Sequence, residues 1–136
     1  MSSAQPGYSM AFRALIVDDR EPVRQQLMAA AVTNGFDVIG QSASLATLLR
    51  DVQEQRPDIV LLDLHLSGDP LTLVPGLILA RPGLLVVATS SFQDIDLMQR
   101  AFDAGVHRCL RKPLRVDEIH RVLENLIEEL NPTIDV

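Results

Sequence analysis

The sequence predicts an α/β fold in which helices cover both faces of a doubly wound, five-stranded parallel sheet. Short apolar runs of strand length alternate along the chain with segments of helical period. These runs are continuously apolar, which is typical of strands buried on both faces of a parallel sheet. The 136 residues suffice for one domain with a real core and are too few for two ordinary domains.

The expected strands end where polar or turn-forming residues begin. The first apolar run, FRALIV, leads directly into Asp18, and the third, DIVLLDL, contains Asp63. Because a buried, unpaired carboxylate is costly, Asp63 is expected either at a strand end or beside a cation. In chain order, the strands are expected at 12–17, 36–40, 58–64, 83–90 and 107–111.

Five helical segments alternate with these strands. Pro22 suits the first turn of the first helix, and Gly35 suits its end. The last helix has apolar residues at helical spacing and carries Asp117 and Glu118 in its first turn, where the helix dipole favours them. The helices are expected at 21–35, 44–57, 69–82, 93–105 and 116–130.

Two of these helices carry more specific expectations. Prolines and a glycine interrupt the segment 69–82, so a short or broken helix is expected there. These interrupting residues are Pro70, Pro75, Gly76 and Pro82. On the segment 93–105, the spacing of Ile95, Met98 and Phe102 predicts that these side chains face the core.

Composition excludes several classes of protein. Hydrophobic residues make up 47% and charged residues 22%, as in soluble globular domains, and no apolar run reaches membrane-spanning length. The net charge of −6, without a basic block, argues against direct nucleic-acid binding by this domain. The first residues lack the pattern of a secretory signal, and the single cysteine, Cys109, excludes an internal disulfide. A cytoplasmic location is therefore expected.

Polar side chains collect where four of the expected strands end. In a parallel sheet the carboxyl ends of the strands lie at one edge, and ligands bind there. Three carboxylates at this edge would repel one another unless a cation compensated, and hard oxygen ligands suit Mg²⁺. The strand-end residues are Asp18 and Asp19, Asp63, Thr89, Ser90 and Ser91, and Lys112 with Pro113.

This set of residues predicts phosphoryl chemistry. A carboxylate beside Mg²⁺ and a lysine can attack a phosphoryl group and form an aspartyl phosphate. Lys112 and the metal would neutralise charge on the phosphoryl oxygens, and a hydroxyl at the end of the fourth strand could hydrogen-bond one of them. Asp63 is then tolerated in its apolar run, because it is expected at a strand end beside a metal and a lysine.

Over residues 12–130 the chain resembles the receiver domain of two-component response regulators. The resemblance rests on the motifs LIVDDREPVR (15–24), PDIVLLDLHL (57–66), VVATSS (86–91) and AGVHRCLRKPL (104–114). It implies a flavodoxin-like (βα)5 three-layer sandwich with strand order 2-1-3-4-5. Residues 1–11 are then expected to be a flexible N-terminal tail, and residues 131–136 a C-terminal tail.

The resemblance implies a role for most of the strand-end residues. Asp63 would accept a phosphoryl group from a sensor histidine kinase or a phosphotransfer protein. Asp18, Asp19 and Asp63, with the backbone carbonyl of His65, would hold Mg²⁺, and Asp19 would do so more directly than Asp18. Lys112 would bind the phosphoryl group.

The resemblance also implies the surroundings of this site. Pro113 would fix the turn after the lysine through a cis peptide bond. The switch hydroxyl falls on Ser90 rather than Thr89 when no gap is allowed before Gly105. Ser91 is then the small neighbour that leaves the phosphoryl site open.

The chain departs from the family's pattern in three places. Cys109 stands where an aromatic residue usually rotates inward on activation. Ser67 replaces a common proline, and the segment after it is shorter than usual. His65 and Phe92 flank the acceptor, and their bulk is expected to slow hydrolysis of the phosphorylated form. A phosphorylated half-life unchanged after both are replaced by small polar residues would contradict that expectation.

The expected function is a signalling switch rather than an enzyme. The chain would catalyse only its own phosphotransfer and a slow autodephosphorylation, and would alter a partner or output surface. By analogy with the family, a second copy of the chain could also be a partner, in a homodimer formed through the fourth helix, fifth strand and fifth helix. Three alternatives stay open: a phosphorylation-independent receiver-like interaction module, a phosphatase of the haloacid-dehalogenase type, and a flavodoxin-like nucleotide binder. Whether the receiver stands alone or belongs to a longer regulator is also open.

Overall fold

The computed structural model describes residues 11–91 and 95–131, and within them five strands alternate with five helices. The strands are β1 (Arg13–Val17), β2 (Asp37–Ser42), β3 (Ile59–Asp63), β4 (Leu85–Ser90) and β5 (Arg108–Arg111). The helices are α1 (Glu21–Thr33), α2 (Leu48–Gln55), α3 (Pro70–Ala80), α4 (Ile95–Ala104) and α5 (Val116–Leu130). The expected tail of residues 1–11, apart from Ala11, and residues 132–136 of the expected C-terminal tail lie outside the described residues.

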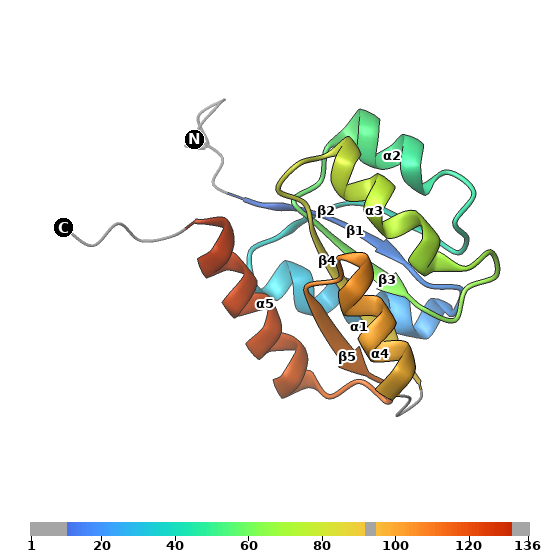
Figure 1. Ribbon diagram of the computed structural model, residues 1–136. Coiled ribbons are helices and arrows are strands. Elements are labelled where there is room, and N and C mark those ends of the chain that lie inside the picture. Colours follow the sequence, from blue (N-terminus) through green and yellow to red (C-terminus); the bar gives the residue numbers. More distant parts are fainter. Residues whose placement is uncertain (1–10, 92–94, 132–136) are drawn as a thin grey trace.

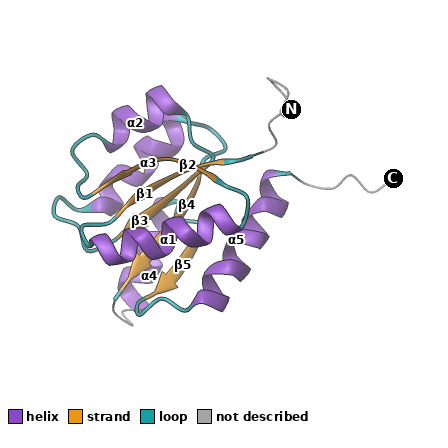
Figure 2. Ribbon diagram, turned by 180° about the vertical axis from the view of Figure 1, so that it is seen from behind, coloured by secondary structure: helices purple, strands orange, loops and turns teal. Residues whose placement is uncertain are grey.

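The strands form one parallel sheet in the order β2-β1-β3-β4-β5, with helices on both faces. Figure 1 shows α2, α3 and α4 on one face, and Figure 2 shows α1 and α5 on the other. Two apolar clusters fill the spaces between these layers. The expected fold class is therefore confirmed. No helix in the described residues is long and apolar enough to cross a membrane.

Burial of the central strands explains their continuous apolar sequences. Every residue of β3 and β4 is buried, because each of these strands has a neighbour on both sides and helices on both faces. Register then sets the strand ends side by side, since Asp63 on β3 pairs with Thr89 on β4, and Ser90 pairs with Arg111 on β5. Asp63 is the last residue of its strand, as one of the two expectations for it required.

The segment 69–82 does not form the short or broken helix expected from its prolines. Instead α3 is an 11-residue helix that contains Pro75. Pro70 occupies its first turn, where a missing N–H costs little. Val74 and Leu77 are fully buried against the sheet, and we attribute the continuity of the helix to this packing, which outweighs the hydrogen bond that Pro75 cannot make.

The inward face of α4 differs from the one expected. Ile95 is 79% exposed and Phe102 is 45% exposed, while Ala101 is fully buried and Met98 is half-buried. Ala101 belongs to the apolar cluster under this helix, and Leu97 and Ala104 pack against that cluster. The prediction that Ile95 and Phe102 face the core was therefore wrong.

Helix α2 begins four residues later than expected. The hydroxyl of Ser42 accepts a hydrogen bond from the backbone N–H of Ser44, and the hydroxyl of Ser44 accepts one from the N–H of Ala46. Such bonds offer the backbone an alternative to helical bonding. The chain therefore forms turns after β2 and becomes helical only at Leu48.

His107 completes the hydrogen bonding of β4 just before β5 begins. Its backbone N–H donates to the carbonyl of Val86 at 2.8 Å, and its Nδ1 accepts the N–H of the same residue at 3.0 Å. Burial lowers the pKa of His107 below its ordinary value of 6.5, and Glu129 opposes this effect while Arg108 adds to it. The imidazole is therefore harder to protonate in the folded chain than in the unfolded one.

This arrangement predicts that His107 makes stability fall as pH is lowered from 7 to 5. The unfolded histidine takes up a proton at higher pH than the folded one, so acid favours the unfolded chain. In urea unfolding, the H107N variant, which retains an acceptor but does not titrate, is expected to lose less stability over this range than the wild type. The H120N variant serves as the control. Equal losses in wild type and H107N would contradict the assignment.

Candidate functional site

The carboxyl edge of the sheet brings together side chains from four strands. Asp18 and Asp19 follow β1, Asp63 and Ser90 end β3 and β4, and Lys112 follows β5. Carboxylate oxygens of the three aspartates all lie within 4.8 Å of one another. The expected convergence of strand ends is therefore present in the structure.

Lys112 bridges two of the three carboxylates. Its Nζ lies 2.9 Å from Oδ2 of Asp18 and 3.5 Å from Oδ1 of Asp63. Asp18 is fully buried and Asp63 is 2% exposed, so water does little to screen these pairs. The carboxylate of Asp63 also accepts the backbone N–H of His65 at 2.9 Å. These contacts explain how an acid is tolerated at the end of an apolar strand.

The turn after β1 fixes the position of Asp18. Its Oδ1 accepts the backbone N–H of Arg20 at 2.8 Å, and its carbonyl accepts a bond from Nη1 of Arg24 at 2.7 Å. The Nε of Arg24 donates to Gln41 on β2. Arg24 was not anticipated from the sequence, although its place in the first turns of α1, six residues after Asp18, was a usable signal. It ties the acidic turn to both flanking elements.

The charges in this cluster suit a divalent cation. Three carboxylates and the Lys112 ammonium leave two negative charges at the edge of the sheet. The donors are hard carboxylate oxygens, and Asp19 is exposed, so water can complete an octahedral shell as Mg²⁺ requires. The residues present therefore fit Mg²⁺. The carbonyl of His65 as a further ligand stays a prediction.

The two candidate switch hydroxyls have different surroundings. Thr89 is fully buried, and its Oγ1 has no hydrogen-bond partner among the described residues. Ser90 is 4% exposed, and its Oγ lies 3.0 Å from Nε2 of His65. The backbone carbonyl of Ser90 accepts the N–H of Lys112 at 2.7 Å. Ser90 thus contacts residues from both neighbouring strand ends.

Three of the remaining predicted residues, Pro113, Ser91 and Cys109, lie in the described part of the chain. The peptide bond between Lys112 and Pro113 is cis, as the resemblance implied. Ser91 is exposed. Phe92 lies outside the described residues. Cys109 is half-buried, packs against the apolar cluster under α4, and burial raises the pKa of its thiol. A packing role for Cys109 is therefore favoured over a reactive one.

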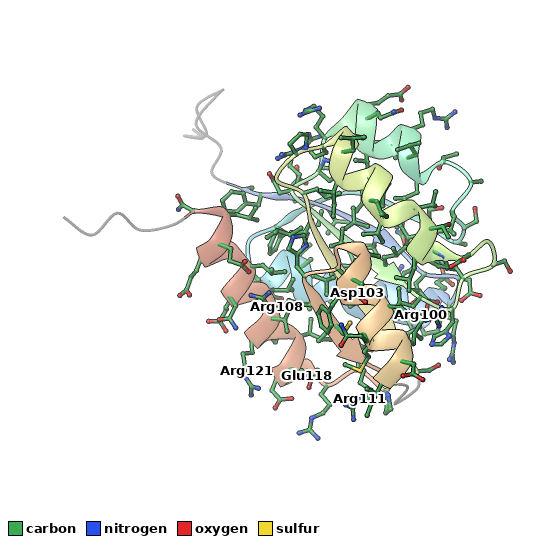
Figure 3. All side chains as sticks on the ribbon, viewed as in Figure 1. Arg100, Asp103, Arg108, Arg111, Glu118 and Arg121 are labelled. Carbon is green, nitrogen blue, oxygen red and sulfur yellow. The ribbon has the colours of Figure 1, made fainter. Side chains whose placement is uncertain are left out.

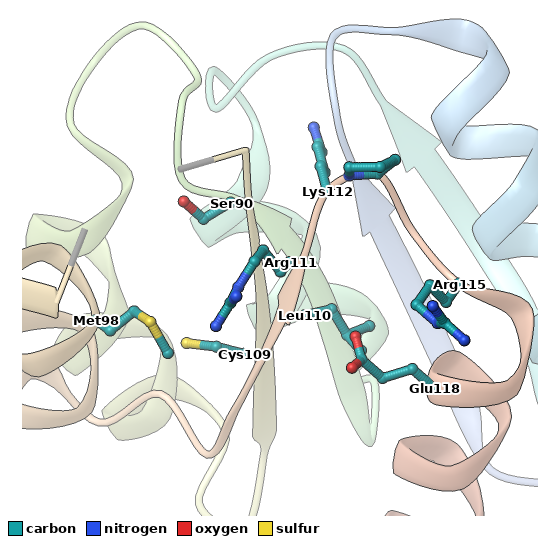
Figure 4. A pocket seen from close by; sticks show the side chains of 9 residues that line it. Ser90, Met98, Cys109, Leu110, Arg111, Lys112, Arg115 and Glu118 are labelled. Atoms are coloured by element: carbon teal, nitrogen blue, oxygen red, sulfur yellow. The ribbon is translucent and has the colours of Figure 1, made fainter. Parts of the chain in front are cut away.

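A cavity of about 460 Å³ lies beside the site, between α4, β5 and α5. Figure 4 shows the side chains of Met98 and Cys109 pointing toward one another within it, with Arg115 and Glu118 at its other side. Its lining residues are Ser90, Met98, Cys109, Leu110, Arg111, Lys112, Pro113, Arg115 and Glu118. Because Ser90 and Lys112 line both the cavity and the acidic site, the two regions are continuous.

Comparison with known proteins agrees with this fold. The family described as the response regulator receiver domain matches residues 14–124. The chemotaxis protein CheY of Bacillus subtilis is 28% identical over 123 residues, covering 90% of this chain and 100% of that protein. A protein-glutamate methylesterase of Rhodopseudomonas palustris is 31% identical over 115 residues. That match covers 82% of this chain, which spans only 31% of the length of the methylesterase.

Solved structures show the same architecture. The receiver domain of AraT, a response regulator from Geobacillus stearothermophilus, superposes with a TM-score of 0.81. The match covers 89% of this chain and 96% of that domain. Because the sequence identity is only 21%, this match supports the fold and not a shared function. Because the family match covers residues 14–124, the chain belongs to the receiver domain family of two-component response regulators.

Proposed function

We propose that this chain is a phosphoacceptor receiver in which Asp63 takes a phosphoryl group from a sensor histidine kinase or a phosphotransfer protein. The observation that carries this proposal is the contact of Asp63 with Lys112 inside a three-aspartate cluster. A carboxylate at the mouth of a strand, next to a cation, can act as a nucleophile. Asp63 is the member of the cluster that lies in the middle strand.

The transfer needs no redox partner. A carboxylate oxygen of Asp63 forms a bond to phosphorus while the bond from phosphorus to the donor's leaving group breaks, and the leaving group takes a proton from water. Lys112 lies where its ammonium can balance charge on the phosphoryl oxygens. Bound Mg²⁺ would supply further charge neutralisation at those oxygens. Asp18, Asp19, Asp63 and the carbonyl of His65 would hold it.

Ser90 is the proposed switch hydroxyl. It lies at the end of β4 and contacts both His65 and the backbone of Lys112. Its O–H would donate to a phosphoryl oxygen on Asp63 and so favour one of two arrangements of the domain. Thr89 fits this role less well, because its hydroxyl is fully buried. The chain would catalyse only its own phosphotransfer and a slow autodephosphorylation. It would do so in the cytoplasm.

The surface of α4, β5 and α5 is the proposed output face. Figure 3 shows side chains of both charge signs there: Arg100, Asp103, Arg108, Arg111, Glu118 and Arg121. Arg108 pairs with Glu129 at 2.7 Å, while the neighbouring cavity reaches Ser90. A protein partner, or a second copy forming a homodimer, could therefore respond to changes at the acidic site. Mixed charges of this kind favour selective pairing.

A phosphorylation-independent interaction module is the second candidate. Cys109 supports it, because its small side chain stands where receivers usually carry the aromatic residue that reports phosphorylation. The acidic cluster and Lys112 favour the phosphoacceptor instead, since three converging carboxylates repel one another unless a cation compensates, and a phosphoacceptor would use that cation.

Removal of metal tests the proposal. The folded chain is incubated with acetyl phosphate in Mg²⁺ or in a chelator, and its intact mass is measured. One added phosphoryl group is expected in Mg²⁺, and almost none in the chelator, because the carboxylates then repel the incoming anion. Absence of an adduct in both conditions, with the chain shown to be folded, would favour the phosphorylation-independent module.

A further inference from the structure

His65 connects the proposed acceptor with the proposed switch hydroxyl. Its backbone N–H donates to Oδ1 of Asp63 at 2.9 Å, and its ring Nε2 lies 3.0 Å from Oγ of Ser90. We infer that His65 is a positioning residue which, in the unphosphorylated chain, accepts the O–H of Ser90 and so withholds it from the phosphoryl site. This inference rests on the proposed function and names a control on that same site.

The backbone explains how one residue reaches both groups. His65 follows Asp63 by two residues, and the N–H of Leu64 between them bonds to the carbonyl of Thr89 at 2.9 Å. The turn after β3 therefore stays attached to the end of β4, where Ser90 follows. The side chain of His65 is exposed, whereas Ser90 is 4% exposed.

The chemistry of a serine hydroxyl makes this contact competitive. Ser90 has one proton to donate, and an imidazole protonated on Nδ1 accepts it at Nε2. Oxygens of a phosphoryl group accept hydrogen bonds and donate none when ionised. Ser90 can therefore donate to a phosphoryl group on Asp63 only by giving up its hydrogen bond to His65. The His65–Ser90 hydrogen bond therefore stabilises the unphosphorylated chain relative to the phosphorylated one by the net free energy of that hydrogen bond.

Two substitutions separate hydrogen bonding from bulk. The H65L variant keeps a side chain of substantial size at the mouth of the site but cannot accept a hydrogen bond. The H65Q variant keeps an acceptor that reaches about as far as Nε2. If the hydrogen bond matters, H65Q should behave like the wild type and H65L should not. If bulk matters, the two should behave alike.

The test measures the affinity for fluoroberyllate, a phosphoryl mimic, by 19F NMR in Mg²⁺. Compared with wild type, H65L is expected to bind roughly three- to tenfold more tightly, the range that corresponds to one net hydrogen bond. H65Q should bind within about twofold of wild type. On the S90A background, adding H65L should change nothing, because the bond is already absent. An equal gain from H65L on both backgrounds would overturn the inference in favour of bulk.

A second measurement keeps the inference testable if the proposed function fails. If wild type binds no fluoroberyllate, the phosphoacceptor proposal is wrong, but the bond itself can still be examined. In the ligand-free chain, the 15N resonance of Nε2 in His65 should be that of an unprotonated acceptor and should shift in S90A. A protonated Nε2, or identical resonances in wild type and S90A, would overturn the inference.

Discussion

Replacing Asp63 by asparagine is expected to abolish phosphorylation from acetyl phosphate in Mg²⁺. Asparagine fills the same space but lacks the carboxylate oxygen that forms the bond to phosphorus. A fall in rate on the order of a thousandfold or more is expected, as when the nucleophile of an enzyme is removed. Intact mass measured over time gives the rate. The fold should survive, because D63N also removes one of three converging carboxylates.

Asp69 provides the matched control for this substitution. It lies in the same loop after β3, is exposed, and adopts a left-handed backbone conformation with φ of 56°, which asparagine tolerates well. The D69N variant should therefore fold and be phosphorylated at the rate of the wild type. An adduct that persists in D63N, or a loss as large in D69N, would remove Asp63 from the role proposed for it.

Replacing Lys112 by methionine is expected to cause the largest loss of stability. The ammonium lies 2.9 Å from Asp18 and 3.5 Å from Asp63, and its own side chain is only 11% exposed. Without it, two buried carboxylates lose their cation, which costs about 3–5 kcal/mol in the absence of Mg²⁺. Urea unfolding at pH 7 in a chelator measures this difference. Adding Mg²⁺ should restore part of it, because the metal then supplies the positive charge.

Arg115 offers the control for this loss. Its contact with Asp117 is 3.5 Å long, and the side chains are 74% and 64% exposed, so solvent screens the pair. The R115M variant should lose no more than about 0.5 kcal/mol. A K112M variant as stable as R115M in the chelator would show that Lys112 does not compensate the carboxylates.

Much of the site could be predicted because it follows from topology. Asp63 and Lys112 lie 49 positions apart in sequence. Asp63 ends β3 and Lys112 follows β5, and the carboxyl ends of all strands in a parallel sheet lie at one edge. Continuous apolar strands gave the evidence for that sheet. No side-chain detail was needed to expect a carboxylate, a hydroxyl and a lysine at the same edge of the sheet.

The predictions for α3 and α4 were wrong because tertiary packing outweighs the local preferences of single residues. Pro75 predicted a break in α3, but buried Val74 and Leu77 hold that helix together. On α4 the largest apolar residues were expected inside, whereas Ala101 faces the core and Ile95 faces solvent. Helical periodicity identifies the buried face of a helix by the contrast between apolar and polar residues. It does not say whether large or small apolar side chains fill that face, and on α4 both kinds are present.

The bond between His65 and Ser90 illustrates what sequence could not supply. Both residues were placed at the site in advance, and His65 was expected to act through its bulk. That its ring turns toward β4 and contacts the hydroxyl depends on a side-chain torsion, which no spacing in the sequence encodes. Arg24 is a similar case, since its guanidinium reaches back to the carbonyl of Asp18.

Locating the phosphoryl group on the chain tests the central claim most directly. Wild-type protein is treated with acetyl phosphate in Mg²⁺, reduced with borohydride so that an acyl phosphate becomes an alcohol, digested, and sequenced by mass spectrometry. The account predicts one modified residue, Asp63, converted to homoserine. A modification at another aspartate, or a phosphoryl group that resists reduction on Ser90 or His65, would contradict it.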